Sequence, residues 1–154
     1  MNKLFFFSLI QFVQMKNFFL FFSAVLIVLL CAPMQAVAQW SNDPNVNNVI
    51  STATGNQDSP TITSDGAGGY IITWRDMRGG PADIYAQRIN PSGAVQWTAD
   101  GVAISTAANN QSSPTIISDG AGGAIITWHD YRSGTNNDIY AQRLNASGTT
   151  QWTT

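Results

Sequence analysis

Lysine, glutamate and cysteine are all missing from residues 39–154 of this 154-residue chain. Without cysteine, this part of the chain cannot form a disulfide, a cysteine-ligated zinc site or a cysteine nucleophile. Its five arginines and nine aspartates give a net charge of about −4, so it lacks the basic surface that binds nucleic-acid phosphates. We therefore expect no nucleic-acid partner.

Acid–base chemistry has few candidate residues here, because the chain contains one histidine, His129, and no glutamate. No second histidine is present to share a metal ion with it. We therefore expect that the protein is not an enzyme and that it has no catalytic residue, no cofactor and no bound metal.

The chain begins with an apolar segment, residues 1–38, which contains no glycine. Within it, residues 15–38 start with a positive charge, continue with an almost unbroken apolar run of 14 residues and end on Ala36-Val37-Ala38. This order is typical of a secretory signal peptide cleaved after Ala38, and the apolar run is shorter than the ~20 residues of a membrane span. An uncleaved membrane anchor is the alternative, and Met15 is an alternative start. We expect a secreted or cell-surface protein.

An internal repeat organises residues 39–154. Residues 56–80 align without gaps on residues 110–134 with 19 of 25 positions identical, and residues 83–97 align on residues 138–152 with 11 of 15 identical. The spacing is 54 residues in the first block and 55 in the second, because one residue is inserted between the blocks. Self-similarity at a fixed period is the signature of a repeat architecture.

A fainter third copy precedes these two. Gln39-Trp40 echoes Gln96-Trp97, and Ile50-Ser51-Thr52 echoes Ile104-Ser105-Thr106. The sequence therefore predicts a signal peptide at residues 1–38, a partial repeat or linker at 39–55, a first repeat at 56–109 and a truncated second repeat at 110–154.

Each copy is predicted to form short strands joined by tight turns. In the second copy, residues 114–118 and 124–128 are β-rich runs on either side of Asp119-Gly120-Ala121-Gly122-Gly123, whose glycines suit a hairpin turn. A third strand is expected at residues 139–144, after a polar loop. No window outside residues 1–38 shows helical periodicity.

A fourth strand should follow, carrying Trp152 in the second copy and running through Trp97 toward Ile104 in the first. Four antiparallel strands every 54 residues match the size of one β-propeller blade. The expected fold class is therefore all-β. It consists of about two tandem four-stranded antiparallel blade-like repeats of β-propeller type, preceded by a hydrophobic signal helix.

The repeated run can be compared with known repeats. The repeated run reads Asp-Gly-Ala-Gly-Gly-x-Ile-Ile-Thr-Trp-x-Asp-x-Arg, followed by Asp-Ile-Tyr-Ala-Gln-Arg and Gln-Trp. This run resembles the repeat of uncharacterised secreted bacterial β-propeller proteins, and the resemblance covers nearly all of residues 39–154. The chain lacks the Ser-x-Asp-x-Gly-x-x-Trp box of sialidase-like propellers, because Asp119 and Gly120 are adjacent. The resemblance implies a fold and a secreted location, and it implies no established reaction.

Comparison of the two copies separates repeated from varied residues at the end of the second predicted strand. The two kinds alternate, as an extended segment does when one side is held by packing and the other is free. We interpret the repeated side as structural, with Asp76 pairing with Arg78, or with an arginine of a neighbouring copy, to brace the loop. The residues interpreted as structural are Trp74, Asp76, Arg78 and Asp83, with their counterparts Trp128, Asp130, Arg132 and Asp138. The candidate ligand contacts are the varied residues Arg75, Met77, His129 and Tyr131.

The repeated aspartates also admit a calcium-binding or a catalytic interpretation. We rank catalysis lowest, because a reaction centre is normally single whereas these aspartates are duplicated with their surroundings. A calcium site needs several oxygen ligands close together, and the asparagines beside Asp138 have no counterparts beside Asp83. The repeated tryptophans are better explained as core residues between units than as sugar-binding platforms.

One blade cannot bury both of its faces, and two units fall short of the about four to eight that close a propeller. We therefore expect a fragment of a longer repeat protein, or assembly with further blades or copies of the chain. The expected function is a secreted, non-enzymatic β-propeller-type module that binds extracellular carbohydrate or protein at or outside the cell surface. The alternatives are a lectin-like carbohydrate-binding oligomer and part of a propeller-type hydrolase.

Overall fold

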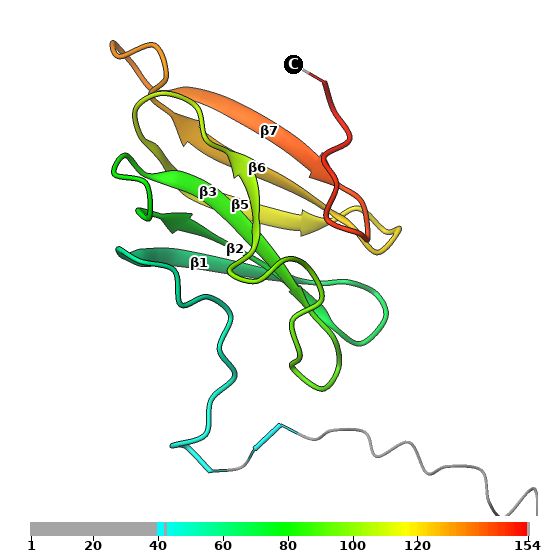
Figure 1. Ribbon diagram of the computed structural model, residues 1–154. Coiled ribbons are helices and arrows are strands. Elements are labelled where there is room, and N and C mark those ends of the chain that lie inside the picture. The colour runs from blue at the N-terminus through cyan, green and yellow to red at the C-terminus, as the bar shows by residue number, and fades with distance from the viewer. Residues whose placement is uncertain (1–39, 42, 154) are drawn as a thin grey trace, which may run out of the picture. The chain divides into compact units, whose positions relative to one another are not determined.

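The computed structural model describes residues 40, 41 and 43–153 (Figure 1). Within this range the chain forms strands and turns, and it contains no helix long and apolar enough to cross a membrane. The expected signal peptide at residues 1–38, its helix and its cleavage site lie outside the described residues. The strands are β1 (Gln57–Ser64), β2 (Tyr70–Asp76), β3 (Asp83–Ile89), β4 (Val102–Ser105), β5 (Gln111–Ser118), β6 (Ala124–Asp130) and β7 (Asp138–Leu144).

These strands form two antiparallel sheets. Sheet 1 has the strand order β1-β2-β3-β4, and sheet 2 has the order β5-β6-β7. The register of the first copy recurs in the second, since Trp74 pairs with Tyr85 in sheet 1 and Trp128 pairs with Tyr140 in sheet 2. The prediction of an all-β fold of antiparallel sheets is confirmed. The part of the chain that the structure describes forms no closed ring of sheets.

The hairpin between β1 and β2 is held by Asp65, the first residue of the Asp-Gly-Ala-Gly-Gly turn. Its Oδ1 accepts hydrogen bonds from the backbone N–H groups of Ala67 and Gly69, both at 2.8 Å. Gly68 has a φ of +86°, a conformation that residues with a side chain rarely adopt. The same carboxylate-to-backbone bonds recur at Asp119, so the predicted hairpin turn is present in both copies.

Each copy also has a bulge in its first strand. The register of β1 shifts beside Pro60, and the preceding residue, Ser59, has a positive φ of 52°. Proline has no N–H to donate, and a bulge is one of the few places where a strand accommodates it. The strand continues on the other side of the bulge, so β5 begins at Gln111 and not at the predicted Pro114.

The segment carrying Trp97 is not a strand, so this part of the sequence-based prediction is wrong. The backbone N–H of Trp97 donates to the side-chain oxygen of Gln87 at 2.9 Å, and not to a backbone carbonyl of a neighbouring strand. The extended chain is then interrupted at Asp100-Gly101, where both residues have positive φ, and only afterwards does β4 begin. Trp152 is held in the same way by Gln142 and also lies outside the strands.

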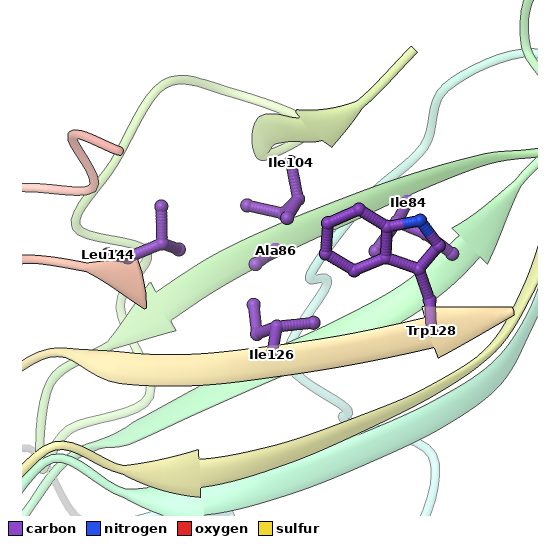
Figure 2. Close-up of a cluster of buried hydrophobic side chains, with 6 residues drawn as sticks. All are labelled: Ile84, Ala86, Ile104, Ile126, Trp128 and Leu144. Atoms are coloured by element: carbon purple, nitrogen blue, oxygen red, sulfur yellow. The ribbon is translucent and has the colours of Figure 1, made fainter. Parts of the chain in front are cut away.

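The two sheets pack against each other face to face (Figure 2). Side chains from β3 and β4 of sheet 1 point toward side chains from β6 and β7 of sheet 2 and form one buried apolar cluster. Its members are Ile84, Ala86, Ile104, Ile126, Trp128 and Leu144. Trp97 is packed against this cluster from outside the strands.

The contact joins unlike faces of the two sheets. Ile84 lies in this contact and is 0% exposed, whereas its counterpart Ile139 lies on the opposite face of sheet 2 and is 69% exposed. In the same way, Trp128 faces sheet 1, whereas its counterpart Trp74 lies on the outer face of sheet 1. The packing is therefore heterologous, so each sheet has one face in the contact and one face outside it.

We predict that Trp128→Ala lowers the free energy of unfolding by ~3–5 kcal/mol, because the substitution empties the centre of the contact between the sheets. His129→Ala should change it by less than about 0.5 kcal/mol, because that side chain is exposed. Denaturant unfolding of both variants measures the difference. Similar losses for the two variants would mean that the faces of β6 are assigned the wrong way round.

Candidate functional site

Asp76, the last residue of β2, is the centre of a buried hydrogen-bond cluster. Its side chain is fully buried, and both of its carboxylate oxygens accept hydrogen bonds. Oδ2 accepts from the indole N–H of Trp74 at 2.8 Å and from Nη2 of Arg78 at 2.6 Å. Oδ1 accepts from the backbone N–H and from Nε of Arg78, both at 2.9 Å. These donors replace the water that burial removes from the carboxylate.

Tyr85 of β3 completes this cluster from the neighbouring strand. The Arg78 guanidinium lies 3.8 Å from the centre of the Tyr85 ring, which is a cation–π geometry. The ring of Tyr85 also stacks on that of Trp74, with 6.4 Å between the centroids. Arg78 additionally donates to the backbone carbonyl of Asp100 at 2.7 Å. One arginine therefore ties the end of β2 to β3 and to the turn before β4.

The second copy repeats the cluster almost unchanged. Asp130 accepts from Trp128 at 2.8 Å and from the Nη2 of Arg132 at 2.7 Å. Arg132 lies 3.7 Å from the ring centre of Tyr140. The ion pair is formed within each copy, and of the two pairings left open by the sequence the structure contains this one.

Electrostatics hold these two carboxylates in the ionised form. Burial by itself raises the pKa of Asp76, but the hydrogen bonds from Arg78 and Trp74 outweigh it, so the pKa lies below its ordinary value. The pKa of Asp130 is lowered for the same reasons. A carboxylate that is buried, ionised and saturated with donors braces the loop and has no proton to transfer at neutral pH.

Asp83 and Asp138, two further repeated aspartates, differ between the copies. Each is opposite a cluster aspartate in the register, so Asp83 pairs with Asp76 across β2 and β3. Burial raises the pKa of Asp83, and the charge of Asp76 raises it further. Asp138 is exposed and accepts a hydrogen bond from Asn136 at 2.8 Å. Within the described residues, no group of three or more histidine, cysteine, aspartate or glutamate side chains could hold a metal ion.

A second repeated ion pair was not anticipated from the sequence. Oδ2 of Asp65, in the β1–β2 hairpin, accepts from Nε and Nη2 of Arg88 at 2.9 and 2.8 Å. Asp119 and Arg143 form the same pair in sheet 2. Arg88 also donates to the carbonyl of Ala146, which ties sheet 1 to a turn of sheet 2. The available signal was that these aspartates and arginines recur at the same places in both copies.

The four candidate ligand contacts do not share one surface. Arg75 lies on the face of sheet 1 that packs on sheet 2, and it pairs with Asp58 at 3.1 Å. Its counterpart His129 lies on the outer face of sheet 2 and is exposed. Met77 and Tyr131 are half-buried residues immediately after β2 and β6, so each lies at the same end of its strand. Of the varied residues, Arg75 therefore lies in the contact between the sheets, whereas His129 lies outside it.

The segment before β1 repeats a contact made between the two sheets. The indole N–H of Trp97 donates to the carbonyl of Ala146 at 3.1 Å. The indole N–H of Trp40 donates at 3.0 Å to the carbonyl of Pro91, the counterpart of Ala146. Trp40 therefore occupies the position on sheet 1 that Trp97 occupies on sheet 2. The fainter third copy in the sequence has this structural counterpart.

An open groove of about 410 Å³ lies between this segment and the outer face of sheet 1. Residues 48–52 line one side of it, and Ile72 and Trp74 of β2 contribute to the other. The segment is held in place by Asp100, whose Oδ1 accepts the backbone N–H of Thr52 at 2.7 Å. The groove is suited to apolar side chains, since its β2 wall is an isoleucine and a tryptophan.

Comparisons with known proteins found no matching family model, no matching curated protein and no matching solved structure.

We predict that the chain loses stability as the pH falls below about 4. Four aspartates that pair with an arginine have a pKa below the ordinary value of 3.8 in the folded chain, so they stabilise the fold above that pH and lose this contribution as they become protonated. They are Asp65, Asp76, Asp119 and Asp130.

Denaturant unfolding at neutral and at acid pH measures this loss. Asp76→Asn cannot ionise, so it should be less stable than the original chain at pH 7 and closer to it in stability at acid pH. A free energy of unfolding that stays constant from neutral to acid pH would contradict this account of the aspartates.

Proposed function

We propose that the protein is a secreted or cell-surface, non-enzymatic binding module of β-propeller type, in which sheets 1 and 2 are adjacent blades. The observation that carries the proposal is the heterologous packing of two sheets with the same register. Packing of this kind can be continued by further units, as it is in a ring of blades. The export pattern of residues 15–38 supports a location outside the cell.

The division between repeated and varied residues supports a binding role. The clusters around Asp76 and Asp130 fix the ends of β2 and β6 in the same way in both copies. The loops that follow differ, because Met77 is replaced by Tyr131 and the loop after Tyr131 is longer and carries two asparagines. A rigid frame that carries varied loops at one end of its strands is a common arrangement for ligand binding.

The same carboxylates support a non-enzymatic assignment. Each is saturated by donors of its own copy and is held ionised, and each is duplicated with its surroundings. The exposed loop after β6, with Tyr131 half-buried at its base, presents hydroxyl and amide groups. Such groups suit the hydroxyls of a carbohydrate, so a lectin-like function is the second candidate.

The test combines a glycan array with a hydrolysis assay on the purified chain. We expect saturable binding without turnover. If the ligand is a carbohydrate, Tyr131→Ala should weaken binding about tenfold, whereas Thr150→Ala, an exposed residue away from this loop, should leave it unchanged. The absence of any bound glycan would exclude the lectin-like candidate. Hydrolysis that is abolished by changing one aspartate would overturn the non-enzymatic assignment.

A further inference from the structure

We propose that the chain associates with further copies of itself head to tail, by repeating between chains the contact that sheet 1 makes with sheet 2 within the chain. The outer face of sheet 2 of one copy would dock on the outer face of sheet 1 of the next. Residues 48–51 of that next copy would pair with β7 as a fourth strand. The inference depends on the repeat and on the two outer faces, and not on the proposed binding function.

The buried cluster between the sheets shows which residues the second contact would use. Its six members have counterparts 54 or 55 residues away, and these fall into two separate groups. Ile50, Ile72 and Trp74 line the groove on sheet 1, and Ile89 is buried on the same face of that sheet. The counterparts of Ile84 and Ala86 do not lie on this face of sheet 1.

Those two residues are Ile139 and Ala141, and they lie exposed on the outer face of sheet 2. Ile117 of β5 is 64% exposed on that face, and Ile125 of β6 lies beside it. Placing this face over the groove of another copy would bring all six counterparts together. Burying isoleucine side chains removes apolar surface from water, so each of these contacts favours association.

The edge of sheet 2 and the segment before β1 are complementary as well. In sheet 1, β3 pairs with β4, but within the described residues β7 has no such neighbour beyond an isolated bridge to Thr150. Residues 48–51 are the counterparts of β4. The register of sheet 1 predicts that Ser51 of one copy pairs with Ile139 of another, as Ser105 pairs with Ile84. An unpaired strand edge is a ready template for such a strand.

The segment already has the position that strand donation requires. Trp40 bonds to Pro91 as Trp97 bonds to Ala146, so residues 40–52 sit on sheet 1 as the β4 region sits on sheet 2. A second copy could therefore add to β7 without rearranging its own segment. A second copy fits this place, because residues 48–51 are the counterparts of β4 and the outer face of sheet 1 is the counterpart of the sheet 2 face that is buried within the chain.

Sedimentation velocity and native mass spectrometry of the purified chain over a wide concentration range test the association. We expect the mass to rise with concentration. Ile139→Asp alters the sheet 2 face, and Ile62→Asp alters the sheet 1 face, where this side chain is 57% exposed. Each should weaken association at least about tenfold while leaving the circular dichroism spectrum of the monomer unchanged. Val95→Asp is the control, because its counterpart Thr150 stays exposed beside the contact within the chain.

Mixing the two interface variants separates head-to-tail packing from other association. The Ile139→Asp chain retains a good sheet 1 face and the Ile62→Asp chain retains a good sheet 2 face, so the mixture should form a one-to-one complex that neither forms alone. The β7 amides of the Ile62→Asp chain should exchange hydrogen more slowly in that complex. A chain that stays monomeric, a mixture that forms no complex, or β7 amides without added protection would overturn the proposal.

Discussion

The packing of one kind of sheet face on the other kind is the interaction on which the rest of this structure depends. Ile84 and Ala86 of sheet 1 are fully buried only because Ile126 and Trp128 of sheet 2 cover them. Each sheet also exposes an isoleucine on its outer face, Ile62 on sheet 1 and Ile139 on sheet 2. The same constraint explains why the segment before β1 folds back over sheet 1, where Ile50 takes the place that Ile104 has on sheet 2.

The buried aspartate clusters give each sheet its own support. Removing Asp76 and Asp130 from water is costly, and the cost is offset by the two indole donors, the backbone N–H groups and the paired guanidinium groups. Each cluster uses only residues of its own copy. The loop after β2 is nevertheless tied to sheet 2, because the backbone N–H of Ala82 donates to Oδ1 of Asn110 at 3.0 Å. The clusters are therefore local supports, whereas the loop after β2 also takes part in the contact between the sheets.

The sequence was informative where the physics is local. The glycines of the turn predicted the hairpin, and the β-rich runs on either side of it predicted strands, such as residues 124–128 within β6. It was misleading where contacts between residues distant in the chain determine the structure. Trp97 lies in a run that looks extended, but the Gln87 side chain takes its N–H and two residues of positive φ interrupt the strand. Arg75 varies between the copies and yet lies in the contact between the sheets, which only the relative placement of the sheets reveals. The pair of Asp65 with Arg88 joins residues far apart in the chain, and recurrence was its only signal.

Equivalent residues of the two sheets have opposite environments because unlike faces meet. Ile84 and Ile139 give the sharpest comparison, because they occupy the same position in an identical local sequence. Denaturant unfolding of Ile84→Ala and Ile139→Ala, at concentrations where the chain is monomeric, compares them. We predict a loss of ~2–5 kcal/mol for Ile84→Ala and a change within about 0.5 kcal/mol for Ile139→Ala. Equal losses, or a larger loss for Ile139→Ala, would contradict it.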